Sequence, residues 1–301
     1  MLGYVKDLCV LQTHENRGIV LVGKELQKYS IFGGSSSKKR SFPPFETPEN
    51  PRYFMQIVKT RRLLEEEVYQ ARSEGKRIGF VPTLGALHAG HMSLVAKALE
   101  TCDFVVASVF VNPTQFNDDA DFDRYPRQVE QDAALLEQHG CHLLYTPGVE
   151  EVYADKESRE YDLGGLDQVL EGPLRPGHFN GVVNVVERLF EHVKPDAACF
   201  GKKDRQQLAI LSHANRTADW GVEIIPCDTI RESDGLAMSS RNALLDADER
   251  KRAVGLYKAL CLAEEDAFKL ELPTVKRYCR DVIERHGMRV EYFDIIHPYR
   301  C

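Results

Sequence analysis

Two histidines, His88 and His91, stand three residues apart beside two glycines, Gly85 and Gly90. An apolar run precedes them and apolar residues at helical spacing follow, which predicts a strand, a loop and a helix. Glycine lets the main chain approach a ligand closely, and N–H groups at a helix start attract anions. The segment therefore predicts a phosphate site. An ordinary polar surface loop is the alternative, and a zinc site is disfavoured because the H-E-x-x-H pattern is absent.

Two further groups of polar side chains lie in predicted loops. Asn112 and Gln115 follow the apolar run 104–110, and carboxamides hold hydroxyls and carboxylates without carrying charge. Arg175 and His178 lie in a segment rich in Pro and Gly, which would hold them rigidly. Taken alone, the first group also fits an ordinary Asn-Pro turn, and the second fits a surface loop with one salt bridge.

A third group starts directly after the apolar run 197–200. Lys203 offers a point charge for a phosphate, and Asp204 can accept hydrogen bonds from ribose hydroxyls. Gln207 lies one helical turn beyond Lys203 and would face the same cleft. The alternative is simply a charged first turn of a helix.

Ser239, Ser240 and Arg241 form a fourth group, in which two hydroxyls and a guanidinium would bind an oxyanion. A Ser-rich turn is the alternative. The group stands where a second domain begins, so it would close over a nucleotide as a mobile loop. The sequence contains neither a G-x-S-x-G nor a Walker A motif. The dominance of phosphate-binding groups is typical of catalysis by positioning and electrostatics on an anhydride.

Apolar runs and helix-like segments alternate along most of the chain. The expected strands are 77–81, 104–110, 141–145, 197–200 and 222–225, and the expected helices are 54–74, 91–101, 128–139, 181–192 and 204–218. The apolar face of the first helix would contain Ile57, Leu63, Leu64 and Val68. This order predicts an α/β fold with a doubly wound parallel sheet. The polar groups begin where strands end, and such sheets bind their ligands at that edge.

Composition divides the chain into three parts. Residues 1–52 contain a basic stretch rich in Gly and Ser, followed by prolines, so we expect a poorly ordered extension. Residues 53–228 hold the alternating elements and form the expected nucleotide-binding domain. Residues 229–301 begin with a turn, and we expect them to form a smaller α+β lid domain. Its expected elements are the helices 246–267 and 273–286 and the strand 289–296.

The 301 residues carry a net charge of −7 and have a pI near 5.8, which argues against a non-specific nucleic-acid binder. The sequence has neither an apolar stretch of membrane-spanning length nor a secretory signal pattern. The eight cysteines form no C-x-x-C pair, and several lie in apolar runs, which indicates small buried thiols in a reducing compartment. We therefore expect a cytoplasmic protein with neither nucleic-acid nor membrane partners.

Six segments together resemble one family. They are P-T-L-G-A-L-H-A-G-H (82–91), F-V-N-P-T-Q-F (110–116), R-Y-P-R (124–127), E-G-P-L-R-P-G-H-F (171–179), F-G-K-K-D-R-Q-Q (200–207) and D-G-L-A-M-S-S-R-N (234–242). They occur in the order and spacing of the pantothenate synthetase family, also called pantoate–β-alanine ligases, and the match covers about residues 55–296. The resemblance implies a Rossmann-like nucleotidyltransferase fold.

The resemblance also implies a C–N ligase that uses ATP and Mg²⁺. Pantoate and ATP would give an enzyme-bound pantoyl adenylate and pyrophosphate. The second substrate, β-alanine, would then attack the adenylate to give pantothenate and AMP. The family further implies a homodimer.

Carried over residue by residue, the resemblance implies roles for the residues that match the family motifs. The implied catalytic residues are His91 (as the acid), His88, Lys203 and Arg241. The residues implied to contact ATP are Thr83, Leu84, Gly85, His88, Gly90, His91, Gly201, Lys203, Asp204, Ile230, Met238, Ser239, Ser240 and Arg241. Those implied to bind pantoate or line its pocket are Asn112, Gln115, Arg175, His178 and Gln207, and Asp132 matches a position tied to Mg²⁺.

Four departures separate this chain from the family pattern. Leu84 replaces the usual Met, Gln131 stands where an acid is common, and Arg205 replaces a usual aromatic residue. The chain also ends after one expected C-terminal strand where the family continues, so we expect an incomplete lid domain with unpaired strand edges. The alternatives are therefore a truncated, catalytically impaired nucleotide-binding protein and a nucleotidyltransferase with another acceptor.

Overall fold

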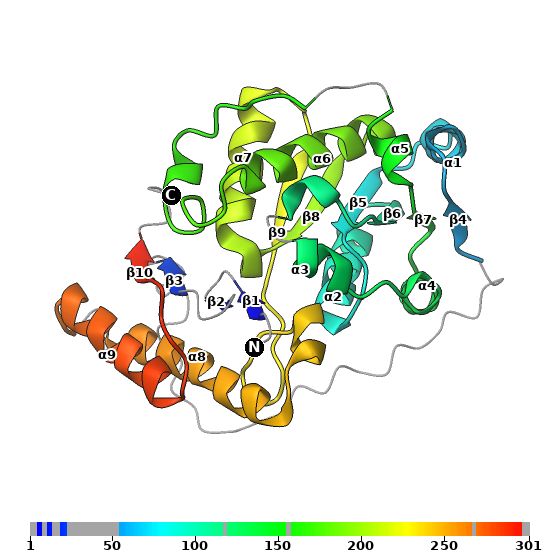
Figure 1. The fold of residues 1–301 in the computed structure, drawn as a ribbon. Coiled ribbons are helices and arrows are strands. Elements are labelled where there is room, and N and C mark those ends of the chain that lie inside the picture. The colour runs from blue at the N-terminus through cyan, green and yellow to red at the C-terminus, as the bar shows by residue number, and fades with distance from the viewer. Residues whose placement is uncertain are drawn as a thin grey trace.

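A six-stranded sheet forms the centre of the computed structural model, which describes residues 5–7, 11–13, 19–22, 54–116, 119–154, 158–266 and 269–296. The strands of this sheet are β4 (Gln56–Val58), β5 (Ile78–Thr83), β6 (Phe104–Val109), β7 (Leu143–Tyr145), β8 (Ala197–Gly201) and β9 (Glu223–Cys227). Their order is β4-β7-β6-β5-β8-β9, and every neighbouring pair is parallel (Figure 1). The predicted α/β fold with a parallel sheet is confirmed.

Helices cover both faces of this sheet (Figure 1). One face carries α1 (Arg61–Ser73), α6 (His178–Val193) and α7 (Arg205–Thr217), and the other carries α2 (Ala89–Thr101) and α4 (Val129–Gln138). Short helices in the connections are α3 (Asp119–Arg124), α5 (Val149–Val152), η2 (Pro113–Gln115), η3 (Leu166–Gln168), η4 (Lys202–Asp204) and η5 (Ser240–Leu244). Neighbouring strand residues such as Phe80 and Val81 belong to opposite cores. Burial on both faces explains the nearly continuous apolar runs of these strands.

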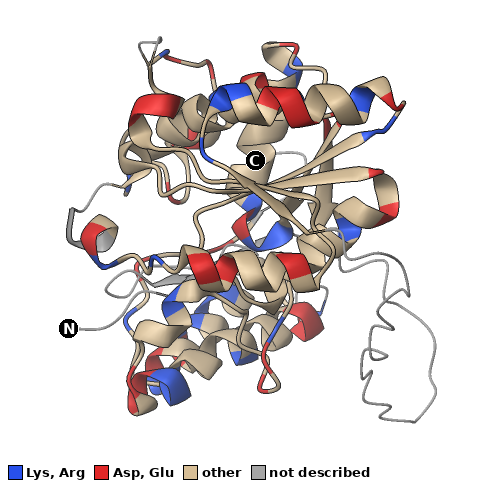
Figure 2. Ribbon diagram, turned by 90° about the vertical axis from the view of Figure 1, so that its right-hand side faces the viewer, with Lys and Arg blue, Asp and Glu red and all other residues tan. Residues whose placement is uncertain are grey.

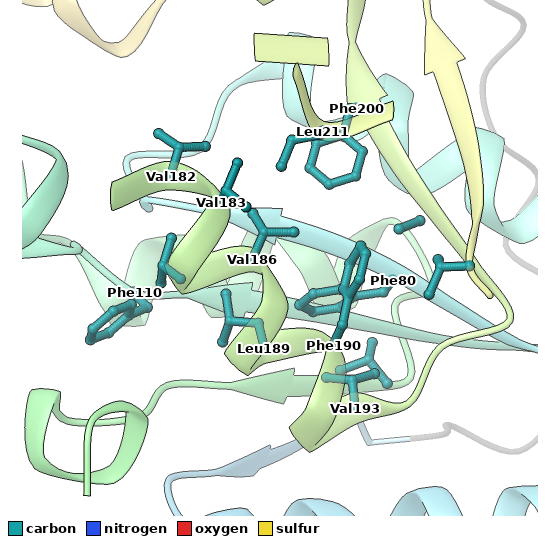
Figure 3. Packing of buried hydrophobic residues seen from close by; sticks show 14 of the residues in the cluster. Phe80, Phe110, Val182, Val183, Val186, Leu189, Phe190, Val193, Phe200 and Leu211 are labelled. Atoms are coloured by element: carbon teal, nitrogen blue, oxygen red, sulfur yellow. The ribbon is translucent and has the colours of Figure 1, made fainter. Parts of the chain in front are cut away.

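Helix α6 is buried on nearly all sides. Its residues Val182, Val183, Val186, Leu189, Phe190 and Val193 share one core with Phe80, Phe110, Phe200 and Leu211 (Figure 3). Each large apolar side chain contributes about 1.5–3 kcal/mol when it is fully buried, so this packing fixes α6 firmly. The helix begins at His178, earlier than the expected 181, directly after Gly177 in the left-handed region (φ 77°).

Residues 54–74 form strand β4 and helix α1, so the prediction of a single helix is wrong. Thr60 caps α1, and its hydroxyl accepts a hydrogen bond from the Leu63 N–H at 3.4 Å. Ile57 and Leu63, both expected on the buried face, are 50% and 38% exposed, whereas the other two residues of that face are buried. The physical reason is tertiary, because β4 exists through its pairing with β7, which is distant in sequence.

Helices α8 (Ala247–Asp266) and α9 (Leu272–Arg285) share a separate core with strand β10 (Phe293–Ile296). The two helices correspond to the predicted helices 246–267 and 273–286, whereas the strand is shorter than the predicted 289–296. Strand β10 pairs in parallel with β3 (Ile19–Val22), so one of the strand edges expected to be unpaired is occupied. Two more short strands, β1 (Val5–Asp7) and β2 (Leu11–Thr13), pair antiparallel. The rest of the predicted extension lies outside the described residues.

Charged residues lie mainly on the helices and connections, and the central strands contain almost none (Figure 2). The described cysteines are free thiols, and those buried are Cys102, Cys141, Cys199, Cys227 and Cys279. This agrees with the predicted small buried thiols, while Cys9 and Cys301 lie outside the described residues. Among the described residues, no helix has both the length and the apolar character needed to cross a membrane.

Candidate functional site

A cavity of about 240 Å³ lies at the carboxyl edge of the sheet, where β5, β6 and β8 end. The predicted site residues that line it are Thr83, Leu84, His88, Gly90, His91, Asn112, Gln115, Arg175, His178, Gly201, Lys203, Asp204, Gln207, Ile230, Met238, Ser239, Ser240 and Arg241. Two predicted site residues, Gly85 and Asp132, are not part of the lining. The fold thus brings His91, Lys203 and Arg241 to one cavity from three distant parts of the chain.

His88 and His91 stand at the first turn of α2 and are fixed by main-chain N–H groups. The Gly90 N–H donates to His88 Nδ1 at 3.1 Å, and the His88 N–H donates to His91 Nδ1 at 3.2 Å. A neutral imidazole nitrogen that accepts a hydrogen bond carries no proton, so both rings carry theirs on Nε2. The rings lie with their centroids 4.1 Å apart, and each offers an Nε2–H donor.

The two imidazoles are neutral at neutral pH. Burial, assisted by the charge of Lys203, lowers the pKa of His88 to about 4. Burial, the neighbouring His88 and Lys203 also hold the pKa of His91 well below its ordinary value. The histidines therefore supply hydrogen-bond donors without charge, and the positive charge at the cavity comes from Arg175, Lys203 and Arg241.

Gly90 leaves the room that the His88 ring occupies. A Cβ at this position would lie 2.8 Å from Cε1 and 2.9 Å from Nδ1 of His88. Gly85 has a different role, because its φ of 84° is left-handed and its Cβ would lie 2.9 Å from the Val109 side chain. The loop therefore needs both glycines, but only Gly90 lies at the cavity.

Asp132 lies beneath the histidine loop and is 1% exposed. Its Oδ2 accepts the Ala86 N–H at 2.9 Å, and its Oδ1 accepts the Leu87 N–H at 2.7 Å. Burial raises the pKa of this carboxyl, and the two N–H groups partly oppose that rise. Both oxygens accept main-chain hydrogen bonds and Asp132 is not among the residues that line the cavity, which argues against the Mg²⁺ role that the resemblance implied. The described residues also contain no group of three His, Cys, Asp or Glu side chains arranged for a metal ion.

The Ser239–Arg241 segment joins the same cavity from the second half of the chain. The Ser239 hydroxyl accepts the Arg241 N–H at 3.3 Å and caps η5. Arg241 is only 7% exposed, and its guanidinium lies 5.2 Å from the centre of the Tyr125 ring. Such stacking holds a guanidinium in place and leaves its edge for anions.

Another part of the cavity wall is held by hydrogen bonds to the main-chain oxygen of Gln115. This oxygen accepts from His178 Nδ1 at 2.7 Å and from Arg175 Nη2 at 3.3 Å. His178 Nδ1 must carry the ring proton, since a carbonyl oxygen only accepts, and its Nε2 accepts from Arg175 Nη1 at 3.0 Å. Arg175 and His178 therefore also hold the loop of Gln115 in place.

Several residues that line the cavity were not predicted from the sequence as site residues. Tyr125 lies inside the segment 124–127, which resembles the family, yet it receives no role there. Glu171 is fully buried and accepts a hydrogen bond from the Tyr292 hydroxyl, which comes from the C-terminal unit. The apolar wall comes largely from α6 and consists of Phe110, Phe179, Val182, Val185, Val186, Leu189 and Phe200. The signal for this wall is the set of apolar residues at helical spacing in the predicted helix 181–192, namely Val182, Val183, Val185, Val186, Leu189 and Phe190.

Comparison with known proteins gives one consistent result. The family model described as pantoate-beta-alanine ligase matches residues 56–301. The chain is 44% identical over 243 residues to a pantothenate synthetase of Bacteroides thetaiotaomicron, covering 80% of this chain and 86% of that protein. It is 47% identical over 248 residues to a pantothenate synthetase of Pseudomonas paraeruginosa, covering 81% of this chain and 88% of that protein.

Two solved structures agree with these sequence relatives. A pantothenate synthetase of Thermus thermophilus superposes with a TM-score of 0.72 at 43% identity, covering 77% of this chain and 83% of that one. A pantoate-beta-alanine ligase of Francisella tularensis, complexed with beta-gamma ATP and beta-alanine, superposes with a TM-score of 0.69 at 33% identity. That match covers 79% of this chain and 88% of the Francisella chain.

Proposed function

This chain belongs to the pantoate–β-alanine ligase family, and from that premise we propose how its cavity carries out the reaction. It is an ATP-dependent ligase that joins pantoate to β-alanine through a C–N bond. The single observation that carries the assignment of residues is that His91, Lys203 and Arg241 share one cavity with Gln115 and Gln207.

The reaction proceeds in two steps through a pantoyl adenylate. A carboxylate oxygen of pantoate attacks the α-phosphorus of ATP, and the bond from that phosphorus to the β-phosphate oxygen breaks, so that pyrophosphate leaves with the electron pair. The free amine of β-alanine then attacks the acyl carbon. The C–N bond forms, the bond to the AMP oxygen breaks, and the amine loses its extra proton to solvent. Burial of the adenylate in the cavity keeps water away from it.

The phosphates of ATP lie against the positive side of the cavity. Lys203 and Arg241 neutralise the charge that grows on the phosphates, and His88 and His91 donate Nε2–H hydrogen bonds to the phosphate oxygens. Their low pKa values favour neutral donors, so no imidazolium acid is needed. Asp204 accepts hydrogen bonds from the ribose hydroxyls.

Pantoate lies on the opposite side of the cavity. The carboxamides of Gln115 and Gln207 bind its polar groups, and Asn112 supports Gln115 by a hydrogen bond. The branched carbon skeleton of pantoate packs on the apolar wall of α6, where burial of methyl groups favours binding. Once the adenylate has formed, the amine of β-alanine reaches the acyl carbon from the space that pyrophosphate has left.

Mg²⁺ would enter the site with the triphosphate of ATP. A divalent ion bound to the phosphate oxygens would lower their charge and favour the departure of pyrophosphate. Because the oxygens of Asp132 accept main-chain hydrogen bonds, a bound ion would be held mainly by the phosphates of ATP and by water.

The enzyme works as a homodimer in the cytoplasm. The free buried thiols of the described cysteines support a reducing compartment, and the dimer rests on the family resemblance. Light scattering on the purified protein tests the assembly, with a mass of twice 34.2 kDa expected.

The reaction is tested with pantoate labelled with ¹⁸O in its carboxylate. We expect AMP only when ATP, pantoate and β-alanine are all present, and we expect one labelled oxygen in the phosphate of that AMP. Formation of ADP with labelled inorganic phosphate would instead indicate an acyl phosphate and would overturn the adenylate route.

Omission of substrates provides the matched controls. AMP that forms equally well without β-alanine would favour a nucleotidyltransferase with another acceptor. ATP binding with no AMP under any condition would favour a catalytically impaired protein.

A further inference from the structure

The carboxamide of Asn112 is completely buried, and its partners fix which way it points. Its Oδ1 accepts from the Thr114 N–H at 3.4 Å, and its Nδ2 donates to the Gly181 main-chain oxygen at 3.5 Å. A main-chain N–H can only donate and a carbonyl oxygen can only accept, so the reverse orientation would place like groups against each other. The oxygen and nitrogen of Asn112 are therefore assigned by chemistry.

This orientation determines what Gln115 offers to a ligand. The Asn112 Nδ2 also donates to Gln115 Oε1 at 3.3 Å, which places the Gln115 oxygen toward Asn112. The Nε2 group of Gln115 is then the end left for the cavity that Gln115 lines. Gln115 thus acts as a fixed N–H donor toward the ligand, although a free carboxamide could present either end.

Tyr153 provides the shortest contact that holds Asn112 in this orientation. It follows α5, and its hydroxyl donates to Asn112 Oδ1 at 2.6 Å. The Arg188 guanidinium lies 4.7 Å from the centre of the Tyr153 ring, and Phe110 packs at 6.5 Å, so the ring is clamped between two elements. Burial raises the pKa of Tyr153, so the hydroxyl keeps the proton that it donates. Tyr153 itself does not line the cavity.

We propose that Tyr153 is a positioning residue that acts through Asn112 and makes Gln115 a dedicated hydrogen-bond donor for the acyl substrate. The inference rests on the proposed function, because it assigns pantoate to this side of the cavity. It also defines a specificity rule: the acyl substrate must present an acceptor, such as a hydroxyl or carboxylate oxygen, to Gln115. The Gln207 carboxamide makes no hydrogen bond to another described residue, so it can present either of its ends to a ligand.

The test is Tyr153→Phe, which keeps the ring and removes only the hydroxyl. We expect the KM for pantoate to rise about tenfold, with kcat and the KM for ATP changing less than about twofold, because only the alignment of the pantoate donor is lost. In a Gln115→Ala background the same change should alter the KM for pantoate less than about twofold, because the group that Tyr153 positions is already absent. An equal effect in both backgrounds would overturn the proposal, as would an unchanged KM for pantoate in the single variant.

Tyr161→Phe is the matched control. The Tyr161 hydroxyl donates to Glu187 on α6, and neither residue lines the cavity. Like Tyr153→Phe, this variant removes a tyrosine hydroxyl that donates to a buried side chain. It therefore controls for a loss of stability that has nothing to do with Gln115. We expect its KM for pantoate to stay within about twofold of the unmodified enzyme.

A second measurement separates failure of this inference from failure of the proposed function. In protein labelled with ¹⁵N-asparagine, the side-chain amide protons of Asn112 should exchange with solvent more slowly in the unmodified protein than in Tyr153→Phe. If the enzyme releases no β-alanine-dependent AMP, the function is wrong, while this difference in exchange would still support the orientation of Asn112. Equal exchange in both proteins would overturn the positioning role of Tyr153.

Discussion

The Ser240 hydroxyl donates a hydrogen bond to the main-chain oxygen of Ala86 at 2.9 Å. Ala86 lies in the histidine loop with a left-handed φ of 51°, and its N–H donates to Asp132. Ala86 is therefore held on its N–H side by Asp132 of α4 and on its carbonyl side by Ser240. This contact directly joins the two segments that we propose to bind phosphate, although they lie far apart in the sequence.

We predict that Ser240→Ala weakens the use of ATP. Loss of a hydrogen bond of this kind costs about 1–2 kcal/mol, so kcat/KM for ATP should fall roughly 5- to 30-fold. Steady-state kinetics with saturating pantoate and β-alanine measures this change. Ser212→Ala is the control, since that hydroxyl donates to the Leu208 main-chain oxygen of its own helix and the variant should leave kcat/KM unaffected. Equal kinetics for the two variants would contradict a link between the segments.

Removing the charge of Lys203 should lower the rate of catalysis. We expect Lys203→Ala to lose about 2–4 kcal/mol of transition-state stabilisation, which corresponds to roughly a 30- to 1000-fold drop in kcat/KM. The matched control is Lys251→Ala on α8, whose side chain is 78% exposed. A drop of about tenfold or less would remove Lys203 from the catalytic residues.

Stability should fall as the pH falls from about 6.5 toward 4. Burial lowers the pKa of His192 to about 4, and its ring contacts the Tyr145 hydroxyl at 3.0 Å. An unfolded histidine takes up a proton near pH 6.5, so between these values the unfolded state binds more protons and is favoured. The effect approaches roughly 3 kcal/mol for this one group at pH 4.

Urea unfolding at several pH values measures this dependence. His192→Gln should show a shallower loss of unfolding free energy between pH 6.5 and 4 than the unmodified protein, because one titrating group is gone. The exposed His139 provides the control, and His139→Gln should keep the original slope. If His192→Gln and His139→Gln have the same slope, burial of His192 does not control the acid sensitivity.

Asp132→Asn separates a structural role from a metal-binding role. An amide group in place of one carboxylate oxygen would face the Ala86 or Leu87 N–H, so the free energy of unfolding should fall by about 2–3 kcal/mol. The Mg²⁺ concentration needed for half of the remaining activity should not change. Glu130→Gln, an exposed position on the same helix, is the control for charge. A large rise in that Mg²⁺ concentration at unchanged stability would instead identify Asp132 as a metal ligand.

The C-terminal unit is attached to the cavity through Tyr292. Its hydroxyl donates to Glu171, and burial raises the pKa of Tyr292, so the proton stays on the hydroxyl. Tyr292→Phe removes one donor from a fully buried carboxylate and should lower the free energy of unfolding by about 1–3 kcal/mol. The control is Tyr278→Phe on α9, a residue that is 41% exposed and should change stability little. Equal unfolding curves for the two variants would show that Tyr292 does not secure the C-terminal unit.

The sequence predicts the sheet and most of the ligand-binding cavity because both follow from local patterns. Runs such as 104–110 are apolar because a strand covered on both faces excludes polar side chains. Lys203 follows one strand and His88 follows another, and the ends of parallel strands meet at one edge. Knowing the strands is therefore enough to bring these groups together.

The errors arise where a residue depends on a distant partner. The sequence predicted residues 56–58 as part of a helix, because they become a strand only through pairing with β7. Asp132 matched a metal position, yet its carboxylate faces the main chain of the histidine loop. Tyr153 carried no signal at all, because its importance lies in a hydrogen bond to Asn112.

The sequence by itself determined the type of fold, the family and the set of polar groups that we propose to bind ATP and pantoate. Only the tertiary structure decided which of these groups face the cavity, which ones support others from behind, and which end of the Gln115 carboxamide is presented. The reason is that residue type fixes what a side chain can donate or accept, whereas its neighbours in space fix the direction and the protonation state.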